Sequence, residues 1–279
     1  MERGITKMMH YQVLNRAILK ITGDDAAKFL QGIITNDIYS QGAIYAMMLG
    51  ANGRYLFDFF ITNLDGGYFL EADIVNLEEL ISKLKLYIIR SKVKIEDVTS
   101  KYQIVYSKTS LEGAYILRSY QDPRFRRMGF RAIVSGQSLV STSNIYFEDK
   151  YLYAIPDGNI DLIHNKSMPQ EYGADHLNAI NYSKGCYLGQ EVICRTKTQG
   201  VVRKNIFKIT ANQDLSHIPQ GTPLLAADHK IGLLCSAYHN FAISLLRIED
   251  YELYKQMHLT LSGIAITLEV PEWMVISRL

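Results

Sequence analysis

The chain has 279 residues, a length that predicts two or three domains. Its composition, 48% hydrophobic and 21% charged, is typical of a soluble globular protein, and its formal net charge of +2 argues against a general nucleic-acid binder. No apolar run is long enough to cross a membrane, which excludes a helical membrane protein.

The first stretch of the chain predicts an α+β region. Residues 16–23 alternate as a short strand, and residues 24–34 have apolar side chains at helical spacing, followed by the polar turn TNDI. Residues 43–74 predict three strands separated by two glycine-containing turns. The clearest helix covers residues 76–90, where Asn76 can cap the start and Leu77, Leu80, Ile81, Leu84 and Ile88 form one apolar stripe. The strand KVKIEDV closes this region, which predicts an α+β layer rather than alternating βαβ units.

The next stretch repeats this pattern less regularly. Four strands are predicted at residues 102–108, 113–120, 129–135 and 151–157, and the basic loop QDPRFRR between them is expected on the solvated surface. Residues 168–195 are expected to be helical and loop-like. After residue 200, several short strands with turn residues between them predict a small β-barrel. We therefore expect α+β regions at 1–100 and 101–198, which can interleave, and a barrel at 199–279.

The cysteines argue against a disulfide framework. Cys186, Cys194 and Cys235 cannot all pair, and none forms a Cys-x-x-Cys. If Cys186 and Cys194 shared one helix they would lie about 12 Å apart along its axis, whereas a disulfide requires Cα atoms within about 7 Å. This favours a reducing compartment. The chain start, MERGITKMMHYQ, lacks the features of a signal peptide and carries Glu2 among its basic residues, so it does not clearly indicate a transit peptide either.

The segment KGCYLGQEVICRTKTQG, residues 184–200, has the most unusual pattern in the chain. Gly185 and Gly189 flank Cys186 and allow the backbone to turn sharply or to approach a ligand. A helix starting after Gly189, together with Lys184, would lower the pKa of the Cys186 thiol. The alternative is that Cys186 is a small buried apolar residue, the role expected for Cys194 and Cys235.

Other kinds of site find no support in the sequence. There is no phosphate-binding G-x-x-x-x-G-K-[ST] and no G-x-S-x-G nucleophile motif. The seven histidines are scattered without metal-ligand spacing, so no metal site is predicted. His164, His176 and His217 are candidates for a partner of Cys186, but spacing alone does not establish a Cys–His pair.

KGCYLGQE, together with the later Arg195, resembles the signature K-G-C-[YF]-x-G-Q-E-x-x-x-R of the YgfZ family. These proteins are folate-binding relatives of the glycine-cleavage T-protein and take part in iron–sulfur cluster assembly and repair. ITGDDAAKFLQGIITNDI, LYIIRSKVKIEDV and MPQEYGADHLNAINYSKGCY are similar to other segments of the family, in the same order. The resemblance covers most of the first two-thirds of the chain. It implies a three-lobed ring of two α+β lobes and a C-terminal β-barrel around a channel for tetrahydrofolate.

The resemblance also implies roles for single residues. It places Glu171 where a carboxylate accepts the adjacent N–H donors of a pterin, and bidentate contacts of this kind are strong. Tyr187 and Arg195 would contact the benzoyl group and the glutamate tail, although Tyr187 can equally be a packing residue and Arg195 a helix-surface charge. Lys184, Gly185, Gly189, Gln190 and Glu191 complete the motif; Glu191 is equally expected to cap a helix or to contact the ligand.

Asp58 separates two branches of this superfamily. T-proteins carry paired aspartates after a Gly-Gly at this place, whereas this chain has Phe57-Asp58 and Arg54 in place of the second glycine. Asp58 is therefore a candidate folate contact or only a polar strand end. The incomplete acidic pair and the presence of Cys186 favour the YgfZ branch over an aminomethyltransferase.

The expected function is a tetrahydrofolate-binding accessory protein for iron–sulfur client proteins, acting as a monomer through Cys186 without nucleic-acid or membrane partners. The thiol would hold iron or a cluster transiently, trap a one-carbon unit, or form a mixed disulfide with a client. The alternatives are a folate-dependent aminomethyltransferase or demethylase, and a thiol adaptor that has lost the folate. The expected location is the cytoplasm of a bacterium or, in a eukaryote, the mitochondrial matrix.

Overall fold

The computed structural model describes residues 10–136, 139–200, 202–249 and 251–274. Most of the N-terminal segment weighed above as a leader, residues 1–9, lies outside the described residues. The chain divides into two compact units, each assembled from separate stretches. The first unit contains Met1–Ala51, Leu56–Tyr146 and Asn178–Gln190, and the second contains Asn52–Tyr55, Phe147–Leu177 and Glu191–Leu279. The expected domain limits at residues 100 and 198 stay a prediction.

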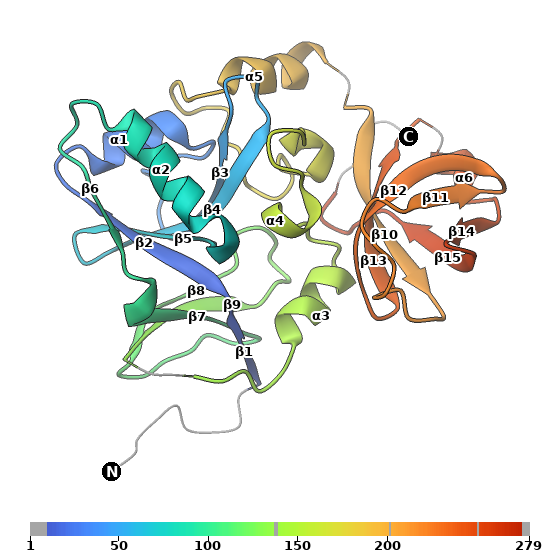
Figure 1. Ribbon diagram of the computed structural model, residues 1–279, viewed down its shortest axis with the longest axis horizontal. Coiled ribbons are helices and arrows are strands. Elements are labelled where there is room, and N and C mark those ends of the chain that lie inside the picture. The colour runs from blue at the N-terminus through green and yellow to red at the C-terminus, as the bar shows by residue number, and fades with distance from the viewer. Residues whose placement is uncertain (1–9, 137–138, 201, 250, 275–279) are drawn as a thin grey trace. The chain divides into compact units, whose positions relative to one another are not determined.

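The first unit contains a sheet covered on one face by two helices (Figure 1). Its strand order is β3 (Ile44–Leu49), β4 (Tyr55–Leu64), β5 (Gly67–Asp73), β2 (Arg16–Thr22) and β6 (Lys94–Asp97). The covering helices are α1 (Ala26–Ile33) and α2 (Leu77–Tyr87). Their apolar side chains pack with those of the sheet into one core, as the helical spacing predicts.

The helix α2 is capped differently from the expectation. In α2 the predicted apolar stripe is buried at Leu80 and Leu84 and half-buried elsewhere. In α1 the apolar residues at helical spacing are all buried: Ala26, Phe29, Leu30 and Ile33. Asn76 occupies the N-cap position of α2 but makes no side-chain capping hydrogen bond. Instead, the side chain of Asp73 accepts the N–H of Val75 and caps the short 3-10 turn η1 (Ile74–Asn76) that precedes α2.

A second sheet lies within the same unit. Its strands, in spatial order, are β1 (Tyr11–Leu14), β7 (Tyr102–Ser107), β9 (Phe130–Ser135) and β8 (Ile116–Gln121), all paired antiparallel; the 3-10 turn η2 (Thr99–Lys101) precedes β7. Phe69 on β5 contacts Tyr102 on β7 edge to face, and Glu71 on β5 bonds Arg131 on β9. The two sheets therefore meet through side chains of alternate residues on facing strands.

The expected strand at residues 151–157 is wrong. Residues 145–152 form the helix α3 (Ile145–Leu152), and the chain after it turns at Ala154, which has a positive φ of 51°. The apolar residues Tyr151 and Ile155, which suggested a strand, are buried on either side of this turn, and the segment pairs with no strand of the described residues. The buried ammonium of Lys150, which bonds Asp161, fixes the last turn of α3 in place.

The second unit contains the predicted barrel. Strands β10 (Lys204–Ala211), β13 (Phe241–Arg247), β12 (His229–Tyr238), β11 (Pro223–Ala226), β14 (Leu259–Leu261) and β15 (Ile264–Glu269) close on one another in that order. Shorter elements complete the unit: α4 (Gly158–Asp161), η3 (Pro169–Tyr172), α5 (Gln190–Gln199) and α6 (Tyr251–Tyr254). The expected α+β class and the C-terminal barrel are confirmed. In the described part of the chain no helix is long and apolar enough to cross a membrane.

Candidate functional site

The motif loop, defined here as residues 181–190, is held against the end of α1 in the first unit. A helix leaves its last carbonyl groups without partners inside the helix. Here the ammonium of Lys184 donates hydrogen bonds to the carbonyls of Gln31, Ile34 and Asn36 at 2.8, 2.6 and 2.7 Å. The N–H of Leu188 donates to the carbonyl of Gly32 at 3.1 Å. The motif loop is therefore the C-terminal cap of α1.

The polar turn after α1 is attached to the same part of the chain. Thr35 donates its hydroxyl to the carbonyl of Ala179 at 2.6 Å, and Asn36 donates its amide to the carbonyl of Asn178 at 2.7 Å. The N–H of Asn181 donates to the carbonyl of Thr35 at 3.0 Å. The TNDI turn and the approach to the motif, far apart in the sequence, thus form one hydrogen-bonded piece of structure.

Lys184 has a structural role that differs from the expected one. Burial lowers the pKa of Lys184 to about 8, and the nearby carboxylate of Asp37 opposes that shift. The side chain remains mostly protonated at neutral pH and directs its ammonium to three carbonyls, 5.1 Å from the ring centroid of Tyr187. An ammonium with three such bonds is not available to hydrogen-bond a thiolate. Activation of Cys186 by contact with Lys184 is therefore not supported.

Cys186 is exposed, so its alternative role as a buried apolar residue is wrong. The turn that carries it is fixed on both sides. Gly189 has a φ of +80°, a conformation that other residues rarely adopt. The Tyr187 N–H donates to the side-chain oxygen of Gln190 at 3.4 Å, and the Gln190 N–H donates back to the Tyr187 carbonyl at 3.2 Å. Gly185 is exposed, and a Cβ built on it would meet nothing within 4 Å. The fixed turn therefore presents the thiol with open space beside it.

The rest of the motif enters the second unit along α5. Glu191 lies in the first turn of this helix and Arg195 one turn later, and both are exposed. Ile193 is buried between them, and its carbonyl accepts the side-chain amide of Gln170 at 3.0 Å. Glu191 is thus placed to complement the helix dipole, which is one of its two expected roles.

Glu171 lies in η3 of the second unit. Its residue is half-buried, while its neighbours Gln170 and Tyr172 are buried. Within the described residues, no hydrogen bond or ion pair of the Glu171 carboxylate is found. Gly173, with a φ of +75°, ends η3, and a Cβ there would lie 2.3 Å from a ring carbon of Trp273, so the backbone after Glu171 is fixed by the tryptophan.

Asp58 lies in the first unit, at the centre of β4, and is buried. The phenol of Tyr45 on β3 donates a hydrogen bond to its carboxylate at 3.1 Å. Tyr187, of the motif loop, is also buried. The expected site residues are therefore divided: Asp58 and Cys186 to Gln190 belong to the first unit, and Glu171, Glu191 and Arg195 to the second.

The basic loop QDPRFRR is only in part the solvated surface segment that we expected, because Arg126 and Arg127 are exposed but its first charged residues are not. Asp122 and Arg124 are each only 1% exposed. Arg124 binds the Asp122 carboxylate through two side-chain nitrogens at 3.0 and 2.8 Å, and Arg131 binds the same carboxylate at 3.2 Å. Burial alone would raise the pKa of Asp122, but the two arginines outweigh burial and lower it. The acid therefore remains ionised between its two cations.

The same set of charges continues to the facing sheet. We define the buried charge network as Arg16, Glu71, Asp122, Arg124 and Arg131. The Glu71 carboxylate accepts from Arg16 at 2.9 Å and from two nitrogens of Arg131. The ring of Phe60, which lies on the same strand β4 as Asp58, contacts two of these arginines. The guanidinium carbons of Arg131 and Arg124 lie 3.8 and 4.9 Å from its centroid. Sequence reasoning missed this network; the signal available was that Arg16, Glu71 and Arg131 are charged residues within otherwise apolar strands.

A second buried charge pair lies in the second unit. The ammonium of Lys150 on α3 donates to Asp161 on α4 at 2.7 Å, and Ser236 on β12 donates its hydroxyl to the other oxygen of Asp161. Cys235, the neighbour of Ser236, is buried, and burial followed by the charge of Asp161 raises the pKa of its thiol well above the usual value. This arrangement joins α3 and α4 to the barrel.

The three cysteines are expected to differ in their rates of alkylation. All three lie in the described part of the chain and are free. Cys186 is exposed, Cys194 is half-buried, and Cys235 is buried with a raised pKa. Since only an accessible thiolate reacts, iodoacetamide should label Cys186 first, Cys194 more slowly, and Cys235 only after unfolding. Mass spectrometry of timed samples measures this order. Labelling of Cys235 in the folded protein as fast as Cys186 would contradict it.

The candidate site has no grouping for a metal ion. Within the described residues, no set of three or more His, Cys, Asp or Glu side chains is placed to hold one. The chemistry that the described residues offer is an exposed thiol on a fixed turn, a half-buried carboxylate and an exposed guanidinium.

Three comparisons place this geometry among known proteins. Residues 203–276 match the family described as CAF17, C-terminal beta-barrel domain. The chain is 29% identical to iron–sulfur cluster assembly factor IBA57, mitochondrial, of Homo sapiens, with 94% of this chain and 84% of the human chain aligned. It is 28% identical to the IBA57 homolog of Mycosarcoma maydis, covering 79% of this chain but only 60% of that protein.

A solved structure shows the same fold. The crystal structure of glycine cleavage system aminomethyltransferase T from Bartonella henselae superposes with a TM-score of 0.70, covering 95% of this chain and 87% of that one at 13% identity. The expected T-protein-like fold is confirmed. Tetrahydrofolate binding and the reactivity of Cys186 stay predictions.

Proposed function

We propose that this chain is a YgfZ-type accessory protein that assembles or repairs iron–sulfur proteins, using Cys186 as its reactive thiol and tetrahydrofolate as its bound cofactor. The observation that carries the proposal is the exposed Cys186 on a turn fixed by Gly189 and Gln190, in a chain that aligns along 94% of its length with a named iron–sulfur cluster assembly factor.

The proposed thiol chemistry depends on a client protein. An iron–sulfur cluster normally takes four protein ligands, and one thiolate cannot hold it alone. Because the described residues contain no further cluster of ligands, Cys186 would act as one ligand among those of a client, or as a thiol that protects or repairs the client. A turn that projects the thiol beside open space at Gly185 suits contact with a second protein. We propose that the protein does this as a monomer.

The Cys186→Ser variant is expected to fold normally and to lose function. The test uses human cells depleted of IBA57 that express this chain with an added mitochondrial leader. The activity of iron–sulfur enzymes per amount of enzyme protein is the readout. The unchanged chain should restore this activity and Cys186→Ser should not, while the half-buried Cys194→Ser serves as the matched control and should restore it. Full restoration by Cys186→Ser would refute the thiol role.

The matched substitution Gly185→Ala separates stability from function. A Cβ at this position meets nothing within 4 Å, so the free energy of unfolding should not change. If a client approaches the turn closely, the added methyl group should nevertheless reduce the restored enzyme activity. Unchanged activity would place the client contact elsewhere on the protein. A failure of the unchanged chain to restore activity would instead refute the proposed function itself.

The residues of the second unit fit the proposed cofactor. Tetrahydrofolate has adjacent N–H donors on its pterin and carboxylates on its glutamate tail. The half-buried carboxylate of Glu171 has no hydrogen bond or ion pair among the described residues, so it can accept the pair of donors, and Arg195 is exposed and can bind a carboxylate. When bound, the cofactor supplies a carrier for one-carbon units. Asp58 and Tyr187 fit less well, because Asp58 bonds Tyr45 and Tyr187 is buried beside Lys184.

Glu171→Ala is expected to weaken tetrahydrofolate binding at least tenfold, about 1.4 kcal/mol. The reason is that the substitution removes a charged acceptor for two donors. Anaerobic calorimetric titration measures the affinity. The control is Glu148→Ala, an exposed carboxylate of the same unit, which should leave the affinity unchanged. Equal affinity in Glu171→Ala would remove this residue from the site, and no binding to the unchanged chain would leave a thiol adaptor without folate.

A second candidate function is a folate-dependent aminomethyltransferase or demethylase. It is favoured by the superposition on aminomethyltransferase T along 95% of the chain. Two observations disfavour it. Phe57 replaces the first aspartate of the T-protein pair, and Asp58 is buried and bonded to Tyr45. An assay for methylenetetrahydrofolate formed from an aminomethyl or N-methyl donor decides between them. Turnover that is lost in Asp58→Asn would favour the transferase, and no turnover is the expected result.

A further inference from the structure

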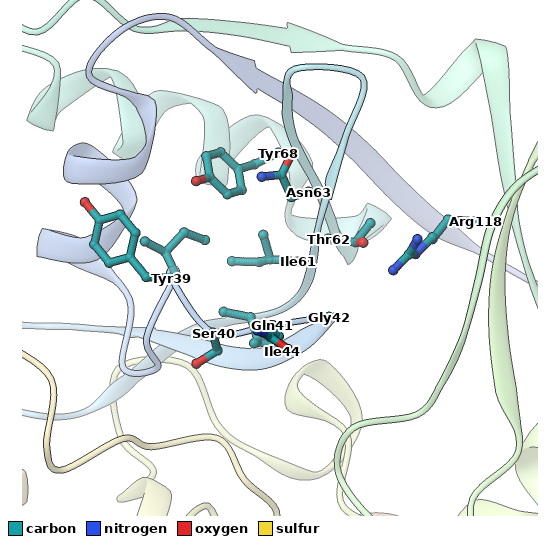
Figure 2. Close-up of a pocket in the computed structure, with 11 residues that line it drawn as sticks. Tyr39, Ser40, Gln41, Gly42, Ile44, Ile61, Thr62, Asn63, Tyr68 and Arg118 are labelled. Carbon is teal, nitrogen blue, oxygen red and sulfur yellow. The ribbon is translucent and has the colours of Figure 1, made fainter.

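A cavity of about 360 Å³ lies in the first unit, and none of the motif residues lines it (Figure 2). Its walls come from the turn at residues 38–42, the start of β3, the end of β4, the start of β5 and one residue of β8. The volume lies near the lower end of the range for small-molecule sites, about 300–1,000 Å³. The cavity is therefore large enough for a ligand of the size of a single aromatic ring with a substituent.

The inner wall of the cavity is apolar and fixed. Ile44 and Ile61 line it, and both belong to the buried core that α1 and α2 share with the sheet. They are only 6% and 1% exposed. Buried core side chains sit in defined positions, so this wall is preformed. It offers a surface for the apolar body of a ligand.

Two tyrosines add hydrogen-bond donors to the same cavity. Burial, followed by the proximity of Tyr39, raises the pKa of Tyr68, so this phenol stays protonated at neutral pH. Tyr39 is 64% exposed at the edge of the opening, an unusual position for a large aromatic side chain. Hydroxyl and amide groups of Ser40 and Asn63 complete the rim. These groups offer several donors near an apolar wall.

The charge of the cavity is positive. Arg118 is the charged side chain of its lining, and no lining residue is acidic. In Figure 2 it lies across the opening from Tyr39. Arg118 is exposed, and within the described residues no ion pair or side-chain hydrogen bond of its guanidinium is found. This differs from the buried charge network of the same unit, in which each arginine has a carboxylate partner.

We propose that this cavity binds a small organic carboxylate with a flat apolar body. The guanidinium of Arg118 would bind the carboxylate in bidentate fashion, and the apolar body would lie against Ile44 and Ile61 beneath Tyr39. A cationic ligand would meet Arg118 without any acidic partner. This site shares no residue with the proposed folate site or with the thiol turn, so the two proposals are independent of each other.

Benzoate, its neutral analogue benzamide and the cation benzylamine are the probes for this site. Titrations of the full chain followed by amide chemical shifts in two-dimensional NMR should show saturable benzoate binding, with the affected amides at Gln41 and Asn63. Benzamide should bind roughly fivefold or more weakly, because it lacks the charge, and benzylamine should not bind. Glu171→Ala, which tests the folate proposal, should leave benzoate binding unchanged.

Two variants and one control make the test specific. Arg118→Gln should weaken benzoate roughly fivefold or more and leave benzamide unchanged. Ser40→Trp, at an exposed position of the lining, should fill the cavity and abolish binding of both probes. Arg90→Gln removes an exposed arginine away from the cavity and should change nothing. Equal benzoate affinity in Arg118→Gln, equal binding of benzylamine, or shifts elsewhere than the cavity would overturn the proposal.

Discussion

Replacing Glu71 with leucine is expected to lower the free energy of unfolding by about 3–5 kcal/mol. The side chain is 2% exposed and holds Arg16 and Arg131 between the two sheets of the first unit. Breaking a buried ion pair on one side leaves the other charge desolvated without a partner, and this costs more than the intact pair contributes. Urea unfolding, followed by circular dichroism, measures the change.

A matched control and a double substitution identify the cause. Glu96 also accepts two cationic side chains, Lys94 and Lys101, but at the surface, so Glu96→Leu should leave stability nearly unchanged. Adding Arg131→Met to Glu71→Leu removes one of the two cations that Glu71 holds, so the double variant should lose less than the sum of the two single variants. A small effect of Glu71→Leu, equal to that of the control, would contradict the proposed importance of this network.

Replacing Lys184 with methionine is expected to lower the free energy of unfolding by about 3 kcal/mol. Methionine keeps much of the apolar stem but leaves the carbonyls of Gln31, Ile34 and Asn36 without their donor. The end of α1 would then keep the Leu188 N–H on the Gly32 carbonyl but lose the other donors of its cap, where it joins the core of the first unit. Urea unfolding measures this loss as well.

The same variant distinguishes a structural lysine from one that activates the thiol. Under native conditions at low temperature, Lys184→Met should keep Cys186 as reactive toward iodoacetamide as in the unchanged chain. An activating lysine would give the opposite pattern, with slower labelling and unchanged stability. Lys92→Met, which removes an ammonium from a side chain that is 78% exposed, should alter neither measurement.

Much of the fold follows from local pattern. The helical stripes of residues 24–34 and 76–90 and the short strands after residue 200 were predictable, because each buries one face against its neighbours. The helix at Ile145–Leu152 was not predictable in the same way. The predicted strand at 151–157 overlaps only the last two residues of this helix, and Asp161, which bonds Lys150 and holds the helix, lies further along the chain.

The candidate site was predictable in its position but not in its electrostatics. The glycine pattern around Cys186 indicated a fixed turn, and Gly189 adopts the expected backbone. Lys184 looked like an activating charge because it lies next to the cysteine in sequence, yet its partners are in α1. The loop QDPRFRR looked like surface because its sequence is rich in arginine, yet Arg124 is buried against Asp122 of the same loop. The more distant parts of the network were not visible either, since the partner of Arg131, the carboxylate of Glu71, lies 60 residues away from that arginine.

The cap that the motif loop provides for α1 has a consequence for biosynthesis. Thr35 bonds Ala179, 144 residues later in the chain. At a synthesis rate of about 5–20 residues per second, the end of α1 waits roughly 7–30 s for its partners. During this time the last carbonyls of α1 lack the donors that the motif loop supplies. A nascent chain that stops before residue 190 therefore lacks a complete first unit and presents a substrate for chaperones or proteases rather than a partly active protein.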